Sequence, residues 1–452
     1  MSRLAALRAL RMLGVAWMTV GFLVACGGGG GGGAGGGSYA ISGNLAGLAS
    51  GGVVVLQNNG GDDLTLRANG AFTFAQNTPV GQPAYRVTVL TQPLHQICSV
   101  TNGSGTAQGD VTSVQVTCSA GPQFAYVANA GANTVSAYSL GAGGALTPVA
   151  GSPFAAGIDP VSVAVNPAGT FVYVANTGSN SVGAYGIAGN GALTPVSGSP
   201  FTTGNAPVAV AVNSAGTFAY VVNQTSNSVS AYAIGADGAL TPVPGSPFTT
   251  GSGPTSVAVN PAGTFVYVDN TAGNSISAYS VGASGALSPV PGSPFATGSA
   301  PYAIAVNPAG TFAYVANYSN NTVWVYSIAA SGALTQLPAL SVTTGTGPDS
   351  VAISPAGTFL YVANATSNNV SVYVIGLGGA LTPLTGSPFA TGSGPVCVAL
   401  NPAGTFAYTA NARVGANDIS GFSVAGDGAL AQLATSPFAT ATGPYSVAVA
   451  QP

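Results

Sequence analysis

The side chains that could support chemistry in this chain are few, and most of them are aspartates. The 452 residues include nine Asp, six Arg and one His, and Lys and Glu are absent. Any hydrolytic activity would therefore need an Asp carboxylate as the base that activates water. The scarcity of cations also excludes a nucleic-acid-binding protein, which needs clustered Lys and Arg to displace counterions.

Seven residues are candidates for a ligand-binding site. They fall in loops or at strand ends expected on one face of the repeat described below, or follow a Pro at the start of the strand nearest the axis: Asp159, Asp269, Tyr302, Asp349, Arg413, Asp418 and Tyr445. Asp269 stands where the other repeats have Ala or Val, and the loop that holds Arg413 and Asp418 is longer than its counterparts. The alternative interpretation is that these are solvated loop residues, with Arg413 paired to Asp418.

The four cysteines call for separate interpretations, and none indicates a metal site. Cys98 and Cys118 lie in successive β-like runs, and an exported location favours a disulfide between them. Closing a loop of about 20 residues stabilises by roughly 3 kcal/mol in the chain-entropy model. Cys397 is interpreted as a small buried hydrophobe rather than a nucleophile, because no His or Lys lies in its part of the chain to lower its pKa. Neither zinc-like nor calcium-like ligand spacing is present, so no metal and no cofactor are expected.

A 47-residue repeat must position the candidate residues. The segment Phe171–Asn176 is one of seven near copies at a constant interval, whose last residues are Asn129, Asn176, Asn223, Asn270, Asn317, Asn364 and Asn411. Each unit contains four short apolar runs separated by turn residues, such as the Asn-Pro-Ala-Gly of 166–169 and the Asn-Gly of 190–191. Four strands per repeat of this length predict a propeller blade. The fourth run, 192–196, contains Pro195, so it is expected at the outer edge.

The two ends of the repeat region predict how the ring closes. The first copy lacks a complete first strand, and residues 445–449 form a first strand with no second strand after it. These partial blades complete each other, which gives seven blades and removes the exposed sheet edges between the termini. A β-helix solenoid, the alternative, does not need complementary ends. The predicted fold class is therefore all-β, with a seven-bladed β-propeller over 120–452.

The Tyr173-Val174-Ala175-Asn176 motif and the Asn-Pro-Ala-Gly turns resemble the YVTN-repeat, lactonase-like β-propeller family over the whole of 120–452. That resemblance implies relatives such as 6-phosphogluconolactonase-like enzymes, whose proposed sites use His, Glu and Arg near the ring axis. This region has no His, Glu or Lys, and its only cation is Arg413. A sugar-phosphate substrate needs cationic partners for its phosphate, so no catalytic residue is carried over from the family.

Residues 38–119 precede the repeats and form a separate unit. Short β-rich runs at 52–57, 64–74, 85–90 and 111–118 predict a small β-sandwich. Asn69 and Gly70 lie between two strand-like triplets, which predicts a hairpin because both residues tolerate positive φ. His95, the only histidine, has no acidic or Cys neighbours and is expected at the surface.

Residues 1–25 predict an export signal followed by a lipid anchor. Arg3, Arg8 and Arg11 precede an apolar core that ends in Leu23-Val24-Ala25-Cys26, which resembles the bacterial lipobox. That resemblance implies acylation of Cys26, with the Gly-rich residues 26–37 as a tether and the outer membrane as the destination. The alternative is an ordinary signal peptide with an incidental Cys.

Three functions are compatible with these patterns. The first is a cell-envelope lipoprotein, monomeric, whose propeller acts as a binding module for an envelope protein or a glycan. The second is a lactonase-type hydrolase that acts on a sugar lactone through an Asp on the loop-rich face. The third is a structural envelope protein without a specific ligand.

Overall fold

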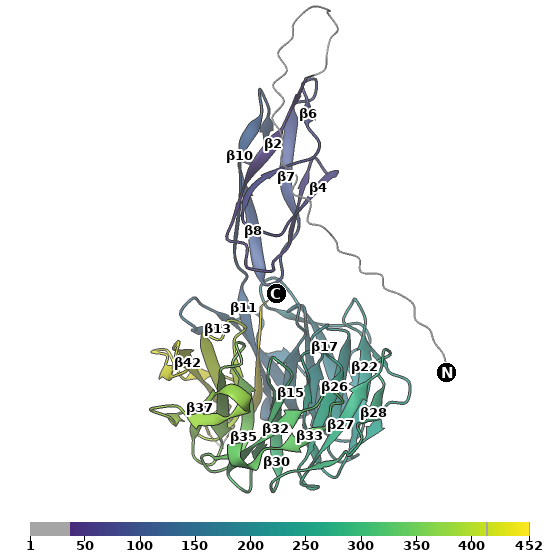
Figure 1. Ribbon diagram of the computed structural model, residues 1–452, viewed down its shortest axis with the longest axis vertical. Helices are drawn as coiled ribbons and strands as arrows, with labels where there is room; N and C mark the ends of the chain where they lie inside the picture. Colours follow the sequence, from purple (N-terminus) through teal and green to yellow (C-terminus); the bar gives the residue numbers. More distant parts are fainter. Residues whose placement is uncertain (1–36, 413–414, 452) are drawn as a thin grey trace, which may run out of the picture.

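The computed structural model describes residues 37–412 and 415–451. They form an elongated molecule in which a small β domain stands on a wider ring of sheets (Figure 1). The predicted export signal, Cys26 and most of the Gly-rich tether lie outside the described residues, as does Arg413. Within the described ranges, no helix is long and apolar enough to cross a membrane.

The N-terminal domain is a sandwich of two four-stranded sheets. One sheet has the order β5-β2-β10-β8 and the other β4-β3-β7-β9, while β1 pairs with β6 at the side. The strands are β1 (Ser38–Tyr39), β2 (Ile41–Ala46), β3 (Val54–Asn58), β4 (Asp62–Leu66), β5 (Gly70–Thr73), β6 (Thr78–Pro79), β7 (Ala84–Thr91), β8 (Gln96–Thr101), β9 (Ser104–Thr106) and β10 (Val111–Ala120). Alternate residues such as Ile41, Leu45, Leu56 and Val116 point inward and are at most 1% exposed, as expected for strands with one buried face.

Two predictions for this domain have different outcomes. The disulfide is confirmed: Cys98 in β8 and Cys118 in β10 are bonded and face each other in an antiparallel pair. The hairpin at Asn69-Gly70 is wrong, because β4 and β5 belong to different sheets. The Asn69 side chain instead accepts a hydrogen bond from Leu48 N and donates one to Leu48 O (2.8 and 2.9 Å), which holds the chain where it crosses between the sheets.

The repeats form seven radial sheets, which confirms the predicted all-β fold with a seven-bladed propeller. Each sheet has an inner strand beside the axis, then a second, a third and an outer strand, all antiparallel. The inner strands are β45 (Pro444–Ala450), β15 (Pro160–Val165), β20 (Pro207–Val212), β25 (Pro254–Val259), β30 (Pro301–Val306), β35 (Pro348–Ile353) and β40 (Pro395–Leu400). The second strands are β11 (Gln123–Asn129), β16 (Phe171–Asn176), β21 (Phe218–Asn223), β26 (Phe265–Asn270), β31 (Phe312–Asn317), β36 (Phe359–Asn364) and β41 (Phe406–Asn411).

The third strand of each blade pairs with two short outer strands rather than with one. The third strands are β12 (Thr134–Leu140), β17 (Ser181–Ile187), β22 (Ser228–Ile234), β27 (Ser275–Val281), β32 (Thr322–Ile328), β37 (Asn369–Ile375) and β42 (Asp418–Val424). The outer pairs are β13 (Leu146–Pro148) with β14 (Phe154–Ala155), β18 (Leu193–Pro195) with β19 (Phe201–Thr202), β23 (Leu240–Pro242) with β24 (Phe248–Thr249), β28 (Leu287–Pro289) with β29 (Phe295–Ala296), β33 (Leu334–Gln336) with β34 (Val342–Thr343), β38 (Leu381–Pro383) with β39 (Phe389–Ala390), and β43 (Leu430–Gln432) with β44 (Phe438–Ala439). The segment 197–201 contains the Gly, Ser and Pro residues typical of a loop, yet its last residue begins the outer strand β19.

Four short 3₁₀ helices complete the described elements. They are η1 (Ala130–Ala132), η2 (Thr177–Ser179), η3 (Pro338–Leu340) and η4 (Leu377–Gly379). The first two lie in the loops between a second and a third strand, and each ends at an Asn in the left-handed region, Asn133 or Asn180. Asn is one of the few residues that adopts this conformation readily.

The ring closes through the C-terminal strand, as predicted. β45 pairs antiparallel with β11, from Phe124 opposite Ala450 to Asn129 opposite Pro444. The two partial blades at the chain ends therefore make one complete sheet, β45-β11-β12-β13.

The repeated tyrosine of each second strand joins its blade to the next. Its hydroxyl donates a hydrogen bond to a Gly carbonyl in the following blade, at 2.7–3.5 Å, in the pairs Tyr126–Gly191, Tyr173–Gly238, Tyr220–Gly285, Tyr267–Gly332, Tyr314–Gly379, Tyr361–Gly428 and Tyr408–Gly144. The acceptor must be Gly because its φ is positive and the neighbouring Phe ring leaves no room: a Cβ on Gly238 would lie 2.3 Å from Phe171. The repeated motif therefore serves packing around the whole ring.

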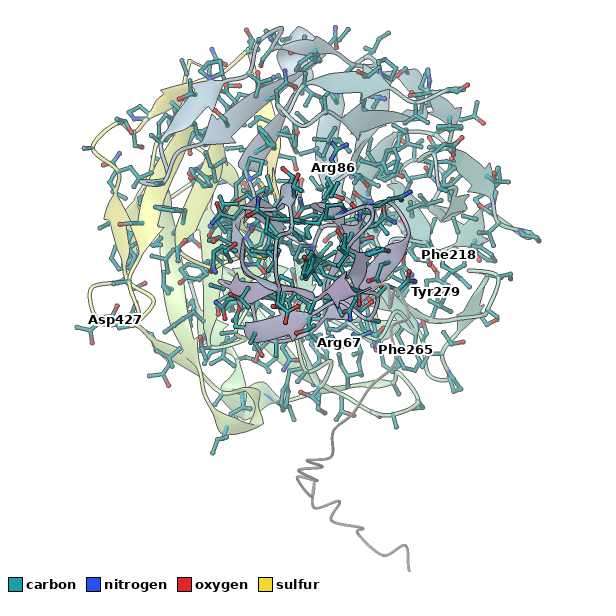
Figure 2. All side chains as sticks on the ribbon, turned by 90° about the horizontal axis from the view of Figure 1, so that it is seen from above. Arg67, Arg86, Phe218, Phe265, Tyr279 and Asp427 are labelled. Carbon is teal, nitrogen blue, oxygen red and sulfur yellow. A yellow bond between two sulfur atoms is a disulfide. The ribbon has the colours of Figure 1, made fainter. Side chains whose placement is uncertain are left out.

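The sandwich covers one face of the propeller. Figure 2 shows it over the middle of the ring. His95 makes the junction: its carbonyl accepts hydrogen bonds from Gly121 N and from Gln451 Nε2, both 2.9 Å, and its Nδ1 contacts Gln451 O. Since β11 begins and β45 ends on this face, the inner strands begin on the opposite, uncovered face.

Candidate functional site

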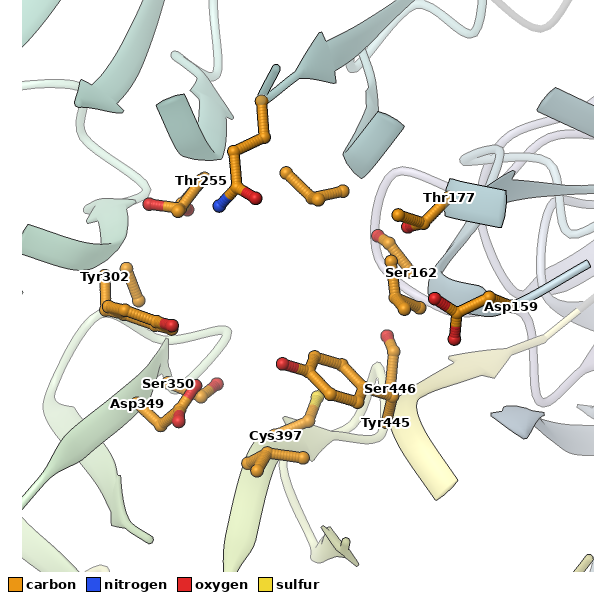
Figure 3. A pocket seen from close by; sticks show the side chains of 16 residues that line it. Asp159, Ser162, Thr177, Thr255, Tyr302, Asp349, Ser350, Cys397, Tyr445 and Ser446 are labelled. Carbon is orange, nitrogen blue, oxygen red and sulfur yellow. The ribbon is translucent and has the colours of Figure 1, made fainter. Parts of the chain in front are cut away.

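A cavity of about 400 Å³ opens at the axis on the uncovered face. Most of its lining comes from the first residues of the inner strands, and all seven blades contribute (Figure 3). The lining residues are Asp159, Val161, Ser162, Thr177, Val208, Gln224, Thr255, Ser256, Tyr302, Ala303, Asp349, Ser350, Val396, Cys397, Tyr445 and Ser446. Its volume lies within the roughly 300–1,000 Å³ typical of small-molecule sites.

A β-bulge turns one residue of each inner strand into this cavity. In β35, Pro348 pairs with Asn364 and Ser350 with Ala363, which leaves Asp349 without a partner on the second strand. A Pro begins the strand because it cannot donate to the ladder, and the extra residue after it is directed away from the sheet. The same bulge precedes the third residue of every inner strand.

The bulge position differs between blades, and this makes the cavity asymmetric. Its occupants, taken around the ring, are Tyr445, Val161, Val208, Thr255, Tyr302, Asp349 and Val396. Tyr302, Asp349 and Tyr445 thus lie on one side, with Val396 between the last two, and Val161 and Val208 lie on the other. Figure 3 shows Asp349 beside Tyr302, and the ring of Tyr445 between Asp349 and Asp159.

Burial raises the pKa of Asp349 to about 7. The cause is desolvation, which disfavours the charged carboxylate at the wall of the cavity. Among the lining residues that the structure describes, no Lys, Arg or His offsets this effect. A carboxyl group with such a pKa can both accept and release a proton near neutral pH, which is the property a general base requires.

The two tyrosines remain protonated donors at neutral pH. Burial raises the pKa of Tyr302, and the negative charge of Asp349 raises it further. The same two causes, in the same order, contribute most to the pKa of Tyr445, which is raised to about 12. Tyr445 is 40% exposed, and the ring of Tyr302 lies 5.1 Å from that of Tyr318. Both rings therefore offer an apolar surface and a hydroxyl to a molecule in the cavity.

Asp159 enters the cavity from a loop rather than from a strand. Its backbone is in the left-handed region (φ 57°), where the corresponding residue of every other blade is Ala or Gly. Hydrogen bonds of 2.8 Å hold it there: Asp159 N donates to Asn133 Oδ1, and Asp159 O accepts from Thr177 N. Asp tolerates this conformation better than most residues, so a carboxylate can be kept at this place.

A layer of serines lies just inside the bulge positions. Ser446, Ser162, Ser256 and Ser350 each accept a hydrogen bond from a backbone amide of the next inner strand, at 3.2–3.3 Å, from Val163, Val210, Ile304 and Val398 in that order. Cys397 holds the same position in the seventh blade, where its sulfur contacts Val447 O. Burial raises the pKa of this thiol, so it is a poor nucleophile at neutral pH.

The structure brings four of the seven predicted residues together: Asp159, Tyr302, Asp349 and Tyr445 all line the cavity. Asp269 does not reach it, because its side chain is 0% exposed and both carboxyl oxygens lack a hydrogen-bond partner among the described residues. Asp418 begins β42 and accepts a hydrogen bond from Asn411 Nδ2 at 2.6 Å, away from the lining. The alternative interpretation, in which Arg413 pairs with Asp418, involves a residue outside the described ranges.

Sequence reasoning did not single out the serine layer, Thr255, Gln224 or Cys397 as parts of a site. A signal was present, because the third residue of the inner strands is Ser in four blades and Ala or Cys in the other three, while the fourth residue is always Val or Ile and the fifth always Ala. No group of three or more His, Cys, Asp or Glu side chains in the described ranges could hold a metal ion.

The family described as "Lactonase, 7-bladed beta-propeller" matches this chain over residues 84–202, 195–300 and 287–398. These segments together span well over half of the sequence, so the chain belongs to that family. No curated protein matches the chain.

Solved structures with the same fold come from several bacteria. The periplasmic gluconolactonase PpgL of Pseudomonas aeruginosa superposes with a TM-score of 0.63 at 19% identity, over 73% of this chain and 100% of that one. A candidate 6-phosphogluconolactonase of Bacteroides fragilis gives 0.64 at 20% identity, over 73% and 98%. A protein of Lactobacillus plantarum gives 0.63 at 20%, over 73% and 99%. At these identities the likeness demonstrates the fold.

Proposed function

We propose that this protein is a hydrolase that opens neutral sugar lactones, with Asp349 as the general base. The observation that carries the proposal is that Asp349, whose pKa is raised by burial to about 7, lies at the wall of the axial cavity. The propeller that holds this cavity belongs to the lactonase family. A base is most effective when its pKa lies near the working pH, because it is then deprotonated yet still takes up a proton.

The lining favours an uncharged, hydroxyl-rich substrate. Tyr302 and Tyr445 provide ring surfaces, and Gln224, Thr255 and Asp159 provide donors and acceptors for hydroxyl groups. A phosphorylated sugar needs a cation close to its phosphate, whereas the described lining has two carboxylates and no cation. The gluconolactonase of Pseudomonas aeruginosa offers a parallel for an unphosphorylated substrate.

The reaction follows from ordinary ester hydrolysis. The ionised Asp349 takes a proton from a water molecule while the water oxygen attacks the lactone carbonyl carbon. The carbonyl oxygen becomes an oxyanion, the ring C–O bond then breaks, and the leaving alkoxide receives the proton held by Asp349. The product is a hydroxy acid. Asp349 is ionised again as soon as its proton has passed to the alkoxide, and the new carboxyl group then releases its own proton to solvent.

The hydrolase is favoured over the binding module that was the first expectation from sequence. That expectation rested on the absence of His, Glu and Lys from the propeller. Burial of Asp349 offers a base without any of these residues, and family membership gives the hydrolytic reaction a precedent.

The proposal includes export and a lipid anchor at Cys26, with the monomer held at the outer membrane. Its support is the order of basic end, apolar core, lipobox and Gly-rich tether in residues 1–37. The Cys26→Ser variant should move from the membrane fraction to the soluble fraction. Persistent membrane association of this variant would rule out the anchor.

The function is tested with purified protein and a panel of aldonolactones, with spontaneous hydrolysis subtracted. We expect turnover of glucono-δ-lactone and a much lower kcat/KM for its 6-phosphate, because the phosphate meets carboxylates rather than cations. Absence of enzymatic turnover across the whole panel would refute the hydrolase and leave the binding module as the better explanation.

A further inference from the structure

The serine layer of the cavity is interrupted in three of the seven blades. Where no serine is present, a backbone amide of the next inner strand lacks the hydroxyl oxygen that would accept its hydrogen bond, and we call such an amide uncapped. In four blades, the third residue of the inner strand is a Ser whose Oγ accepts a hydrogen bond from the amide of the fourth residue in the next inner strand. Ala209 and Ala303 occupy this position in two other blades and have no acceptor to offer. Val257 and Val351 are the fourth residues of the inner strands that follow these alanines, so by the repeat their amides face an alanine where the other blades have a serine.

Only one of these two interruptions faces the cavity. Ala303 is part of the lining, together with Tyr302 before it and with Asp349 and Ser350 on the next strand, whereas Ala209 is not. Val351 lies two residues after Asp349 on β35, so the amide and the carboxyl group are on the same inner strand and on the same side of the ring. The amide of Val257 has no carboxyl group at the corresponding place, because Thr255 precedes it.

The seventh blade differs from both alanine sites. Cys397 fills the serine position there, and its sulfur lies against the backbone of Val447. The volume above that amide is therefore occupied, although a thiol is a weak hydrogen-bond acceptor. Among the three exceptions to the serine pattern, Ala303 alone is a cavity-lining residue without any acceptor atom for the amide of the next inner strand.

We propose that the backbone N–H of Val351, exposed by Ala303, is the oxyanion donor for lactone hydrolysis at Asp349. This inference rests on the proposed function. When water adds to the lactone carbonyl carbon, the C=O electron pair moves onto the carbonyl oxygen, and the N–H of Val351 donates a hydrogen bond to that negative oxygen. The bond persists until the C–O bond of the ring breaks and the carbonyl group re-forms in the product's carboxyl group. A backbone donor fixed in a strand needs no reorganisation as the charge develops.

The chain provides its own test, because restoring the missing serine should cap the amide. Ala303→Ser places a hydroxyl where four other blades already hold one, so the propeller should fold and Val351 N should donate to the new Oγ. We expect kcat for glucono-δ-lactone to fall by roughly 100-fold, the usual loss when an oxyanion donor is removed. The matched control is Ala209→Ser, which caps Val257 outside the cavity and should leave kcat unchanged.

A second control separates capping from bulk. Ala303→Cys adds a side chain of the kind found at Cys397 but only a weak acceptor, so it should retain far more activity than Ala303→Ser. Equal losses in the two variants would assign the effect to bulk and overturn the proposal. An unchanged kcat in Ala303→Ser would overturn it as well.

A binding measurement distinguishes failure of this inference from failure of the proposed function. Gluconate, the ring-opened product, presents a carboxylate oxygen to the same amide, and calorimetry measures its affinity without any turnover. We expect Ala303→Ser to weaken gluconate binding by roughly tenfold or more, the effect of losing one hydrogen bond to a charged group, and Ala209→Ser to leave it unchanged. Equal affinity in wild type and Ala303→Ser, or no binding to wild type, would refute the oxyanion site. Absence of lactone turnover in wild type would refute the hydrolase and with it the oxyanion role, whereas the gluconate measurement would still decide whether the Val351 amide binds a negative oxygen.

Discussion

Asp269 should destabilise the propeller, and its replacement by Ala should stabilise it. The side chain is 0% exposed, and neither carboxyl oxygen has a hydrogen-bond partner among the described residues. The other six copies of this position are Ala or Val, so the surrounding blades already fit a small apolar side chain. Burial raises the pKa of Asp269 well above its ordinary value, and the carboxyl group is therefore neutral in the folded protein at acidic pH.

The magnitude has a constant part and a pH-dependent part. A buried polar group without a partner costs about 1–3 kcal/mol, and Asp269→Ala should gain this amount even at about pH 4. As the pH rises above about 4, Asp269 ionises in the unfolded chain but stays protonated in the folded one, so wild-type stability falls. The advantage of the variant should therefore increase by up to about 1.4 kcal/mol per pH unit until the pH reaches the folded pKa.

Urea denaturation of wild type and Asp269→Ala at several pH values between about 4 and 8 tests this prediction. The raised pKa of Asp349 also makes the free energy of unfolding fall as the pH rises. Asp349 is present in both proteins, so its contribution cancels in the difference between them. Asp427→Ala is the control: Asp427 lies in an exposed hairpin turn on the rim and accepts a hydrogen bond from Ala429 N, so its replacement should not stabilise the protein (Figure 2). A lower stability of Asp269→Ala than wild type, or a difference that is flat with pH, would refute the reasoning.

Two further predictions concern the fold. Tyr173→Phe removes one hydroxyl from the ring of Tyr–Gly hydrogen bonds and leaves Gly238 O without this donor, which should lower the free energy of unfolding by about 1–3 kcal/mol. Thermal unfolding measures the loss. An unchanged Tm would contradict the packing role of the motif. Replacing Cys98 and Cys118 by Ser should destabilise the sandwich by about 3 kcal/mol in the chain-entropy model, whereas the propeller should unfold as before. Limited proteolysis with and without a reducing agent should show selective loss of the N-terminal domain, and equal resistance in both conditions would argue against the disulfide's contribution.

The fold could be predicted from the sequence because the repeat gives the same information seven times. The constant interval located the second strand of every blade, and the partial blades at the two ends predicted the closure by β45. The outer strands were less predictable, because strands as short as Phe201–Thr202 carry no alternation of apolar and polar residues. The failed hairpin at Asn69-Gly70 has a tertiary cause: hydrogen bonds from Asn69 to the distant Leu48 direct the chain into the second sheet.

The site was predictable to the extent that it breaks the repeat. Tyr302, Asp349 and Tyr445 share one position in the unit, so their convergence followed once a closed ring was predicted. Asp269 also breaks the repeat but points elsewhere, because it lies two residues after Tyr267 and shares the strand face that packs against the next blade. The bulge that turns Asp349 into the cavity and the burial that raises its pKa depend on the neighbouring blades, and no local pattern encodes them.

The central claim is that Asp349 is the base of a lactone hydrolase, and the pH dependence of turnover tests it most directly. With glucono-δ-lactone as substrate, kcat/KM of the wild-type protein should rise with pH and level off above an apparent pKa of about 7, because only the ionised carboxylate accepts a proton. Asp349→Asn should lose at least about 100-fold in kcat/KM and the pH dependence with it, while Asp418→Asn keeps both. Wild-type activity that survives Asp349→Asn with the same pH profile would contradict the account.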